Sequence, residues 1–144
     1  MKILMVCLGN ICRSPLSHGV MAHLIKEQQL AWSVESAGTG DWHVGQEPDK
    51  RAIAIAHKYG VDISSQRARH FKDSFFDQYD RILVMDESNY GNVLALAKNE
   101  HQRAKVQMFL REGAVPDPYF DGNMFDPVYQ MIEKRCKELL AELK

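Results

Sequence analysis

The chain has 144 residues, of which 45% are hydrophobic and 26% are charged, and its formal net charge at pH 7 is −1. A chain of this length buries roughly 68–70% of its unfolded surface, so we expect one domain, residues 1–144, that folds without metal or disulfide bonds. The near-neutral charge leaves no basic field, so we expect neither nucleic acid nor a membrane surface as a partner.

The cysteines and the N-terminal residues limit the class of protein further. Cys7, Cys12 and Cys136 give neither an even disulfide framework nor the paired Cys-x-x-Cys spacing of a zinc site, and the six histidines are scattered. We therefore expect no bound metal. The N-terminus has one lysine and a short apolar run that Gly9 and Asn10 interrupt, which is neither a signal peptide nor a membrane span. We expect a cytoplasmic protein in a reducing compartment.

Apolar strands alternate with helical periods along the chain, which predicts an α/β fold with a parallel sheet covered by helices on both faces. The predicted strands are residues 2–6, 32–36, 82–85 and 106–109. The predicted helices are 15–29, 48–59, a short one over 86–96, and a final helix with the buried stripe Val128, Ile132, Cys136, Leu139 and Leu143. We expect loops over 37–46 and 113–123 and an irregular segment over 62–77. Functional sites in such sheets lie beyond the carboxyl ends of the strands, and this assignment leaves Cys7, Trp42, Asp86 and Asp117 there.

The segment from Cys7 to Arg13 is the most informative part of the chain. A cysteine, five residues and an arginine can form a ring whose backbone N–H groups point inward and bind a phosphate dianion. We expect Gly9 to supply conformational freedom in this turn, and Pro15 to lie in the first turn of a helix whose positive dipole end faces the ring. The ring residues between the two ends are Leu8, Gly9, Asn10, Ile11 and Cys12.

These surroundings favour the thiolate form of Cys7 at neutral pH, which makes it a nucleophile. Arg13 offers a planar fork that can bind two phosphoryl oxygens in the transition state. Ser14 can donate its hydroxyl to the thiolate and help the cysteine to leave in a second step. The alternative is that Cys7 only ends a buried strand, because free cysteine is often buried. The combination of strand, glycine, cysteine, arginine, serine and proline favours the anion site.

Hydrolysis of an aryl phosphate through a phosphocysteine requires a proton for the departing phenolate, since the pKa of a phenol is about 10. Asp117 lies between Pro116 and Pro118, which stiffen the backbone around its carboxylate. We predict that Asp117 is the general acid, and that it then takes a proton from the attacking water. The alternative is a Pro-Asp-Pro turn that only connects a strand to the last helix.

Trp42 and Tyr119 are candidate walls for the flat ring of an aryl substrate. Large aromatic faces suit this role, and both residues are predicted to lie on long loops near the nucleophile. For each residue taken alone, ordinary packing is the alternative.

The nucleophile loop Val6–Pro15, together with Ser36-Ala-Gly-Thr39, Met85-Asp-Glu-Ser-Asn89 and Asp117-Pro-Tyr119, resembles the low-molecular-weight protein tyrosine phosphatases. The resemblance covers essentially the whole chain. It implies a three-layer α/β sandwich with a four-stranded parallel sheet, and a two-step hydrolysis of phosphotyrosine without metal or cofactor. In this resemblance Cys7 is the nucleophile, Arg13 the phosphate clamp and Asp117 the general acid. Asn10 holds the shape of the loop, and Ser14 assists the leaving thiolate.

The resemblance also implies partners. They are a phosphotyrosine-containing protein, of which a bacterial tyrosine kinase is one candidate, and phosphate or other oxyanions in the active site. The stretch 37–43 is similar to the bacterial branch of the family. Many members carry two adjacent tyrosines after the acidic loop, whereas here Phe120 follows Tyr119, so we do not expect regulation through a tyrosine pair. Similar proteins can close a disulfide between the positions of Cys7 and Cys12 under oxidation; the alternative is that Cys12 only fills the loop.

Three rival functions fit the Cys7 loop. Arsenate reductases of the same fold relay oxidation through further cysteines in a mid-chain segment, and this chain has none between Cys12 and Cys136. A phosphocarrier module must not hydrolyse its phosphocysteine, whereas Arg13 and Asp117 favour hydrolysis. A phosphopeptide-binding module does not require a nucleophile.

Overall fold

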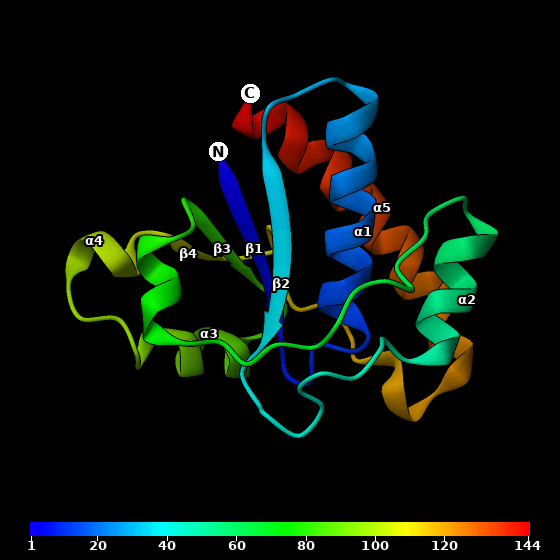
Figure 1. The fold of residues 1–144 in the computed structure, drawn as a ribbon, viewed down its shortest axis with the longest axis horizontal. Helices are drawn as coiled ribbons and strands as arrows, with labels where there is room; N and C mark the ends of the chain where they lie inside the picture. Colours follow the sequence, from blue (N-terminus) through cyan, green and yellow to red (C-terminus); the bar gives the residue numbers. More distant parts are fainter.

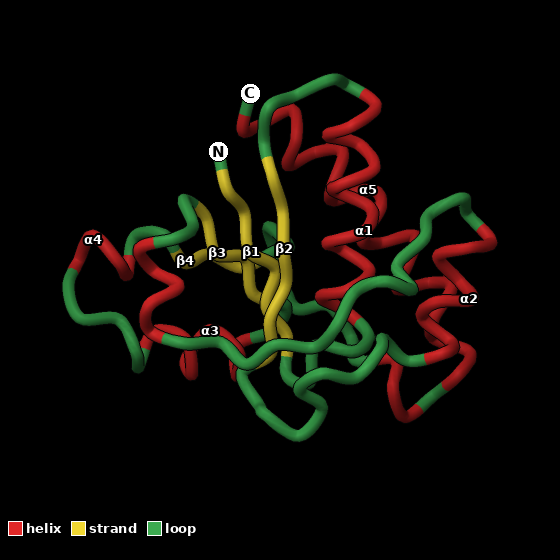
Figure 2. The backbone as a smooth tube through the Cα atoms, in the orientation of Figure 1, coloured by secondary structure: helices red, strands yellow, loops and turns green.

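The computed structural model describes residues 1–144 and contains one sheet of four parallel strands (Figures 1 and 2). The strands lie in the order β2-β1-β3-β4 and are β1 (Lys2–Cys7), β2 (Ser33–Gly38), β3 (Arg81–Val84) and β4 (Val106–Met108). The predicted α/β fold with a four-stranded parallel sheet flanked by helices is confirmed, and each predicted strand is displaced by at most two residues at either end.

The helices also follow the predicted order, with one addition. They are α1 (Arg13–Glu27), α2 (Lys50–Lys58), α3 (Glu87–Leu94), α4 (Glu100–Arg103) and α5 (Phe125–Leu143). The short helix α4 was not predicted, because a single turn is too short to show a hydrophobic period. Asn99 caps it by accepting a hydrogen bond from the backbone N–H of Gln102. None of the helices combines the length and the hydropathy that a membrane span requires.

The central strand β1 is buried on both faces, which explains its continuous apolar sequence. Ile3 and Met5 belong to the larger core cluster, which includes the apolar faces of α1 and α5. Leu4 and Val6 point to the smaller cluster on the other face, where Phe76 is fully buried. In Figure 1, α1 and α5 lie on one side of the sheet, and α3 and α4 lie on the other. The sheet is therefore the middle layer of three.

Several predicted details differ from the structure. The segment 62–77 is not wholly irregular, because Asp73–Asp77 form a 3₁₀ turn and His70 makes an isolated parallel bridge to Gly38. The loop 113–123 contains the 3₁₀ turn Pro118–Phe120 and the start of a second one. Leu143, predicted in the buried stripe of the last helix, is only partly buried, because it lies in the final turn of α5 at the end of the chain.

The pairing of β1 fixes the place of the loop that follows it. Cys7 pairs with Gly38 on β2, and Val6 pairs with Val84 on β3. Beyond the last strand pair, the backbone N–H of Thr39 donates to the carbonyl of Cys7 at 2.9 Å. The loop after Cys7 therefore emerges at the carboxyl edge of the sheet and is tied to the segment that leaves β2.

Gly38 is the position where this edge is tightest. A Cβ atom at Gly38 would lie 2.7 Å from the carbonyl oxygen of Leu8 and 3.1 Å from the backbone nitrogen of Asn10. We expect Gly38→Ala to lower the free energy of unfolding by about 1–3 kcal/mol, because the loop backbone must move to relieve the contact.

Urea unfolding measures this difference, and Gly91→Ala is the matched control. Gly91 lies inside α3, and a Cβ there would meet nothing within 4 Å. Alanine should raise the stability at this position by up to about 1 kcal/mol, because glycine is the poorer helix former. Equal changes in the free energy of unfolding for Gly38→Ala and Gly91→Ala would contradict the packing of Gly38 against the loop.

Candidate active site

The loop from Cys7 to Arg13 connects the end of β1 directly to the start of α1. Asn10, which is buried, adopts a left-handed conformation with φ of 57°, which asparagine tolerates better than most residues. The prediction that Gly9 supplies the unusual backbone conformation of this turn is wrong, because the φ angle of Gly9 is not positive. The space at Gly9 is nevertheless tight, since a Cβ there would lie 3.1 Å from the ring of His43.

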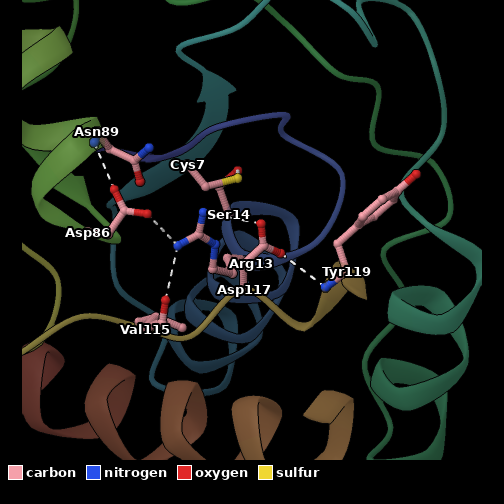
Figure 3. A network of polar contacts seen from close by, with 8 residues as sticks. All are labelled: Cys7, Arg13, Ser14, Asp86, Asn89, Val115, Asp117 and Tyr119. Atoms are coloured by element: carbon pink, nitrogen blue, oxygen red, sulfur yellow. Dashed lines mark hydrogen bonds and ion pairs between the residues drawn. The ribbon is translucent and has the colours of Figure 1, made fainter. Parts of the chain in front are cut away.

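Cys7 and Ser14 face each other, as predicted. The Sγ atom of Cys7 lies 3.0 Å from the Oγ atom of Ser14, and both side chains are buried (Figure 3). Asn10 donates from Nδ2 to the same Oγ atom at 2.8 Å. Its carbonyl Oδ1 accepts the backbone N–H of Arg69 at 2.9 Å, which fixes the orientation of the amide. Because Asn10 is the donor to Ser14, the hydroxyl hydrogen of Ser14 is free to point at the sulfur of Cys7.

Arg13 is buried and held from two directions. Its Nη1 donates to Oδ2 of Asp86 at 2.8 Å and to the carbonyl of Val115 at 3.0 Å (Figure 3). The side chain is only 4% exposed. Burial alone would lower the pKa of Arg13, but the negative charges of Cys7 and Asp86 outweigh it and raise that pKa. Arg13 is therefore a permanent positive charge with a fixed orientation beside the nucleophile loop.

Asp86 makes a contact with Arg13 that the sequence did not reveal. The predicted helix start is confirmed, because Asp86 caps α3 by accepting the backbone N–H of Asn89 at 2.8 Å. Its second oxygen accepts from Arg13, a contact across 73 residues. The position of Asp86 in the chain could have indicated this contact. Asp86 follows β3, which pairs with β1, so Asp86 and Arg13 both lie at the same edge of the sheet.

Asp117 lies on the loop before α5, close to Arg13. Its Oδ2 is 3.7 Å from Nη2 of Arg13, and its Oδ1 accepts the backbone N–H of Tyr119 at 3.1 Å (Figure 3). The side chain is 34% exposed, so a substrate and water can reach it. The structure thus brings together the three residues for which the sequence predicted chemistry, namely Cys7, Arg13 and Asp117.

A surface pocket opens over the nucleophile loop, and its mouth is aromatic. Trp42 is 65% exposed, Tyr119 41% and Phe120 87%, which is unusual exposure for such large apolar side chains. The two predicted walls therefore line one pocket, and Phe120 is a third wall residue that the sequence did not suggest. The lining residues are Leu8, Gly9, Ile11, Cys12, Trp42, His43, Asp117, Tyr119 and Phe120.

A second polar network supports the nucleophile loop from behind. Asn10 donates to Oγ of Ser36 at 3.0 Å, and that oxygen lies 3.1 Å from Nδ1 of His18 on α1. Burial lowers the pKa of His18 to about 4, with Arg69 acting in the same direction and Glu35 opposing it. His18 is thus a neutral hydrogen-bonding group at pH 7. The sequence did not identify it, because one histidine on a helix carries no pattern.

The other two cysteines are chemically unlike a nucleophile. Cys12 and Cys136 are free and buried, and burial raises the pKa of both thiols. For Cys12 the neighbouring carboxylate of Asp49 acts in the same direction. Cys136 is fully buried in α5, as predicted for a core residue. No group of three or more His, Cys, Asp or Glu side chains is placed to hold a metal ion.

Comparison with known proteins agrees with this arrangement. The family model described as "Low molecular weight phosphotyrosine protein phosphatase" matches residues 2–144. The low molecular weight protein-tyrosine-phosphatase YfkJ of Bacillus subtilis is 33% identical over 150 residues, which cover 99% of this chain and 96% of that protein. The chain therefore belongs to the low molecular weight protein tyrosine phosphatases, a family of hydrolases, as the sequence predicted.

Two solved structures are also similar over nearly the whole chain. A protein tyrosine phosphatase from Entamoeba histolytica with Hepes in the active site has a TM-score of 0.93 and 33% identity, covering 99% of this chain and 96% of that one. Wzb of Vibrio vulnificus in complex with benzylphosphonate has a TM-score of 0.88 and 30% identity, covering 98% of this chain and 97% of that one. The fold of the family is therefore present here without large insertions or deletions.

The half-buried His18 predicts a pH dependence of stability. Its pKa is about 4 in the folded protein and about 6.5 when unfolded, so the unfolded chain binds the extra proton between these values. Stability should therefore fall as the pH falls through this window. We expect the free energy of unfolding of His18→Gln, which can still hydrogen-bond to Ser36, to fall by about 2 kcal/mol less than that of the parent between pH 7 and pH 5.

Urea unfolding at the two pH values measures this difference, and His101→Gln on the exposed surface of α4 is the control. The control should keep the pH dependence of the parent. An identical loss of stability for His18→Gln and the parent would show that His18 is not buried as a neutral group.

Proposed function

We propose that this phosphatase hydrolyses phosphotyrosine in proteins, and small aryl phosphates, through a phosphocysteine intermediate on Cys7. The observation that carries the proposal is the 3.0 Å contact between Cys7 Sγ and Ser14 Oγ inside the buried loop that ends in Arg13. The hydroxyl can donate to the sulfur, and the fixed guanidinium ends the same loop. The same groups would stabilise the charge of a phosphoryl group during transfer.

In the first step the thiolate of Cys7 attacks phosphorus, and the bond between phosphorus and the aryl oxygen breaks as the sulfur–phosphorus bond forms. The loop amides of residues 8–13 and the guanidinium of Arg13 hold the non-bridging oxygens. Asp117 gives its proton to the departing phenolate oxygen. Its carboxyl is 34% exposed and lines the pocket that would hold the leaving group.

In the second step water attacks the phosphocysteine, and Asp117, now a carboxylate, accepts a proton from that water. The sulfur–phosphorus bond breaks, and inorganic phosphate forms. The Ser14 hydroxyl donates to the departing thiolate of Cys7, which makes it a better leaving group. Asn10 fixes the direction of this hydroxyl, because it already donates to the Ser14 oxygen at 2.8 Å.

The aromatic mouth of the pocket supports an aryl substrate. Trp42 comes from the loop after β2 and Tyr119 from the loop before α5, so they line the pocket from separate segments. The bound benzylphosphonate in the Wzb relative joins a ring to a tetrahedral anion, the same two parts that phosphotyrosine presents. A phosphotyrosine protein, for example a bacterial tyrosine kinase in the cytoplasm, fits this chemistry.

The rival functions find less support in these residues. An arsenate reductase would need further reactive thiols outside the loop of Cys7 and Cys12, and the one cysteine there, Cys136, is fully buried in the core. A phosphocarrier would need to protect its phosphocysteine from water, whereas Asp117 stands 3.7 Å from Arg13 in an open pocket. Release of inorganic phosphate from an aryl phosphate, without a partner protein, distinguishes hydrolysis from both.

Cys7→Ser should abolish turnover of p-nitrophenyl phosphate, because a serine hydroxyl is not ionised in this loop at neutral pH. The variant should still bind inorganic phosphate in isothermal titration calorimetry, because the ring amides and Arg13 remain. Full turnover by Cys7→Ser would place the nucleophile elsewhere.

Arg13→Lys should lower kcat at least about 100-fold, because an ammonium cannot replace the fork that contacts both Asp86 and a phosphoryl group.

Asp117→Asn tests the acid. It keeps an oxygen that can accept the Tyr119 N–H but cannot donate a proton as a carboxylic acid does. We expect kcat/KM for phenyl phosphate, which reports the first step, to fall about 100-fold or more, and kcat/KM for p-nitrophenyl phosphate to fall much less, because nitrophenolate leaves without a proton.

Asp121→Asn is the matched control, since Asp121 lies in the same loop and accepts a backbone N–H from Asn123 in the same way. It should leave both rates near those of the parent. Parent-like hydrolysis of phenyl phosphate by Asp117→Asn would refute the acid assignment.

A further inference from the structure

Arg51, in the first turn of α2, contacts three segments around the active site, and none of the steps above uses it. It is 43% exposed and lies outside the set of predicted site residues. Its contacts join the nucleophile loop, through Asp49, to the loop that carries Asp117. In Figure 1 the segment that precedes α5 lies beside α2.

The first contact is with Asp49, which caps α2. Nε and Nη2 of Arg51 donate to the two oxygens of Asp49, each at 3.0 Å, and the backbone N–H of Arg51 donates to Oδ1 at 2.8 Å. The backbone N–H of Asp49 in turn donates to the carbonyl of Ile11 at 2.8 Å. Ile11 belongs to the nucleophile loop. One residue therefore separates the guanidinium from the ring that surrounds Cys7.

The second contact is with the loop that carries Asp117. Nη2 of Arg51 donates to the carbonyl of Tyr119 at 2.9 Å, and the guanidinium lies 5.5 Å from the centre of the Tyr119 ring. It also lies 4.7 Å from the ring of Phe125, the first residue of α5. Tyr119 is the residue whose backbone N–H donates to the carboxyl of Asp117 (Figure 3). Arg51 thus binds the carbonyl of Tyr119, while the backbone N–H of the same residue orients Asp117.

We propose that Arg51 is a positioning residue that holds the Asp117 loop against the nucleophile loop. In this role it sets the distance between the acid carboxyl of Asp117 and the oxygen of the leaving group. The inference rests on the proposed function, in which Asp117 is the general acid. Arg51 itself touches neither the nucleophile nor the reacting phosphoryl group.

A purely structural role for Arg51 would need only its contacts with Asp49. These contacts already provide the cap of α2 and a surface ion pair, and exposed ion pairs contribute little to stability. The hydrogen bond to Tyr119 crosses 68 residues and adds a contact that the cap does not need. Because Arg51 is partly exposed, its loss should change the stability of the fold little. Its loss should change proton donation instead, since small displacements of a catalytic group cost large factors in rate.

Arg51→Met keeps much of the aliphatic side chain and removes all donors. We expect kcat/KM for phenyl phosphate to fall about tenfold, and kcat/KM for p-nitrophenyl phosphate to stay within about threefold of the parent. Arg51→Lys should recover part of the rate on phenyl phosphate, because an ammonium can reach Tyr119 or Asp49 but cannot bridge them as the fork does.

Arg103→Met is the matched control. Arg103 is 41% exposed and pairs with Glu100 three residues away on α4, so the change removes a similar surface ion pair. It should leave both rates unchanged. Urea unfolding of Arg51→Met and Arg103→Met checks that neither variant is partly unfolded under the assay conditions.

The double variant Arg51→Met/Asp117→Asn completes the test. If Arg51 acts through Asp117, it should show the same ratio of the two rates as Asp117→Asn alone. Equal losses on both substrates for Arg51→Met, or a further selective loss in the double variant, would overturn the inference and leave the proposed function intact. If the single variant Asp117→Asn loses the same factor in rate on phenyl phosphate and on p-nitrophenyl phosphate, the assignment of Asp117 as the acid is overturned, and the role of Arg51 with it.

Discussion

The buried guanidinium of Arg13 is the constraint on which the site depends. A buried positive charge needs partners, and removing one of them from such a pair typically costs about 3–5 kcal/mol. Here the partners are Asp86, which follows β3, and the carbonyl of Val115, which follows β4. Arg13 itself begins α1, directly after the loop that holds Cys7. The parallel sheet therefore brings the positive charge, its two anchors and Cys7 to one edge.

The nucleophile loop and the acid loop are held in different ways. Around Cys7 the contacts are buried and formed by side chains with fixed hydrogen-bond directions, as in the chain from Ser14 to Asn10. Around Asp117 the contacts are exposed, and Arg51 supplies one that reaches back toward the nucleophile loop. Exposed segments with few buried contacts open more easily than the core. This difference suits a site that must keep an anion hole rigid while it admits a large substrate and water.

The fold and the centre of the site could be predicted from the sequence because their signals are local. The strand before Cys7, the spacing to Arg13 and the period of α1 all lie within a few turns of chain. The contact of Asp86 with Arg13 and that of Ser36 with His18 depend on how distant segments meet, so no local pattern encodes them. The backbone of the loop between Cys7 and Arg13 was also predicted only in part. The sequence predicted an unusual backbone conformation at Gly9, but the left-handed residue is Asn10, whose amide also donates to Ser14.

The central claim is that phosphorus becomes bonded to the sulfur of Cys7, and a rapid denaturing quench tests it most directly. In Asp117→Ala with p-nitrophenyl phosphate, the first step needs little acid help, while the second lacks the base that accepts a proton from water. A phosphocysteine intermediate predicts a stoichiometric burst of nitrophenolate and, by mass spectrometry, phosphorus on the peptide that contains Cys7. If inorganic phosphate forms in step with nitrophenolate from the first turnover and Cys7 carries no phosphorus at any time, Cys7 is not the nucleophile.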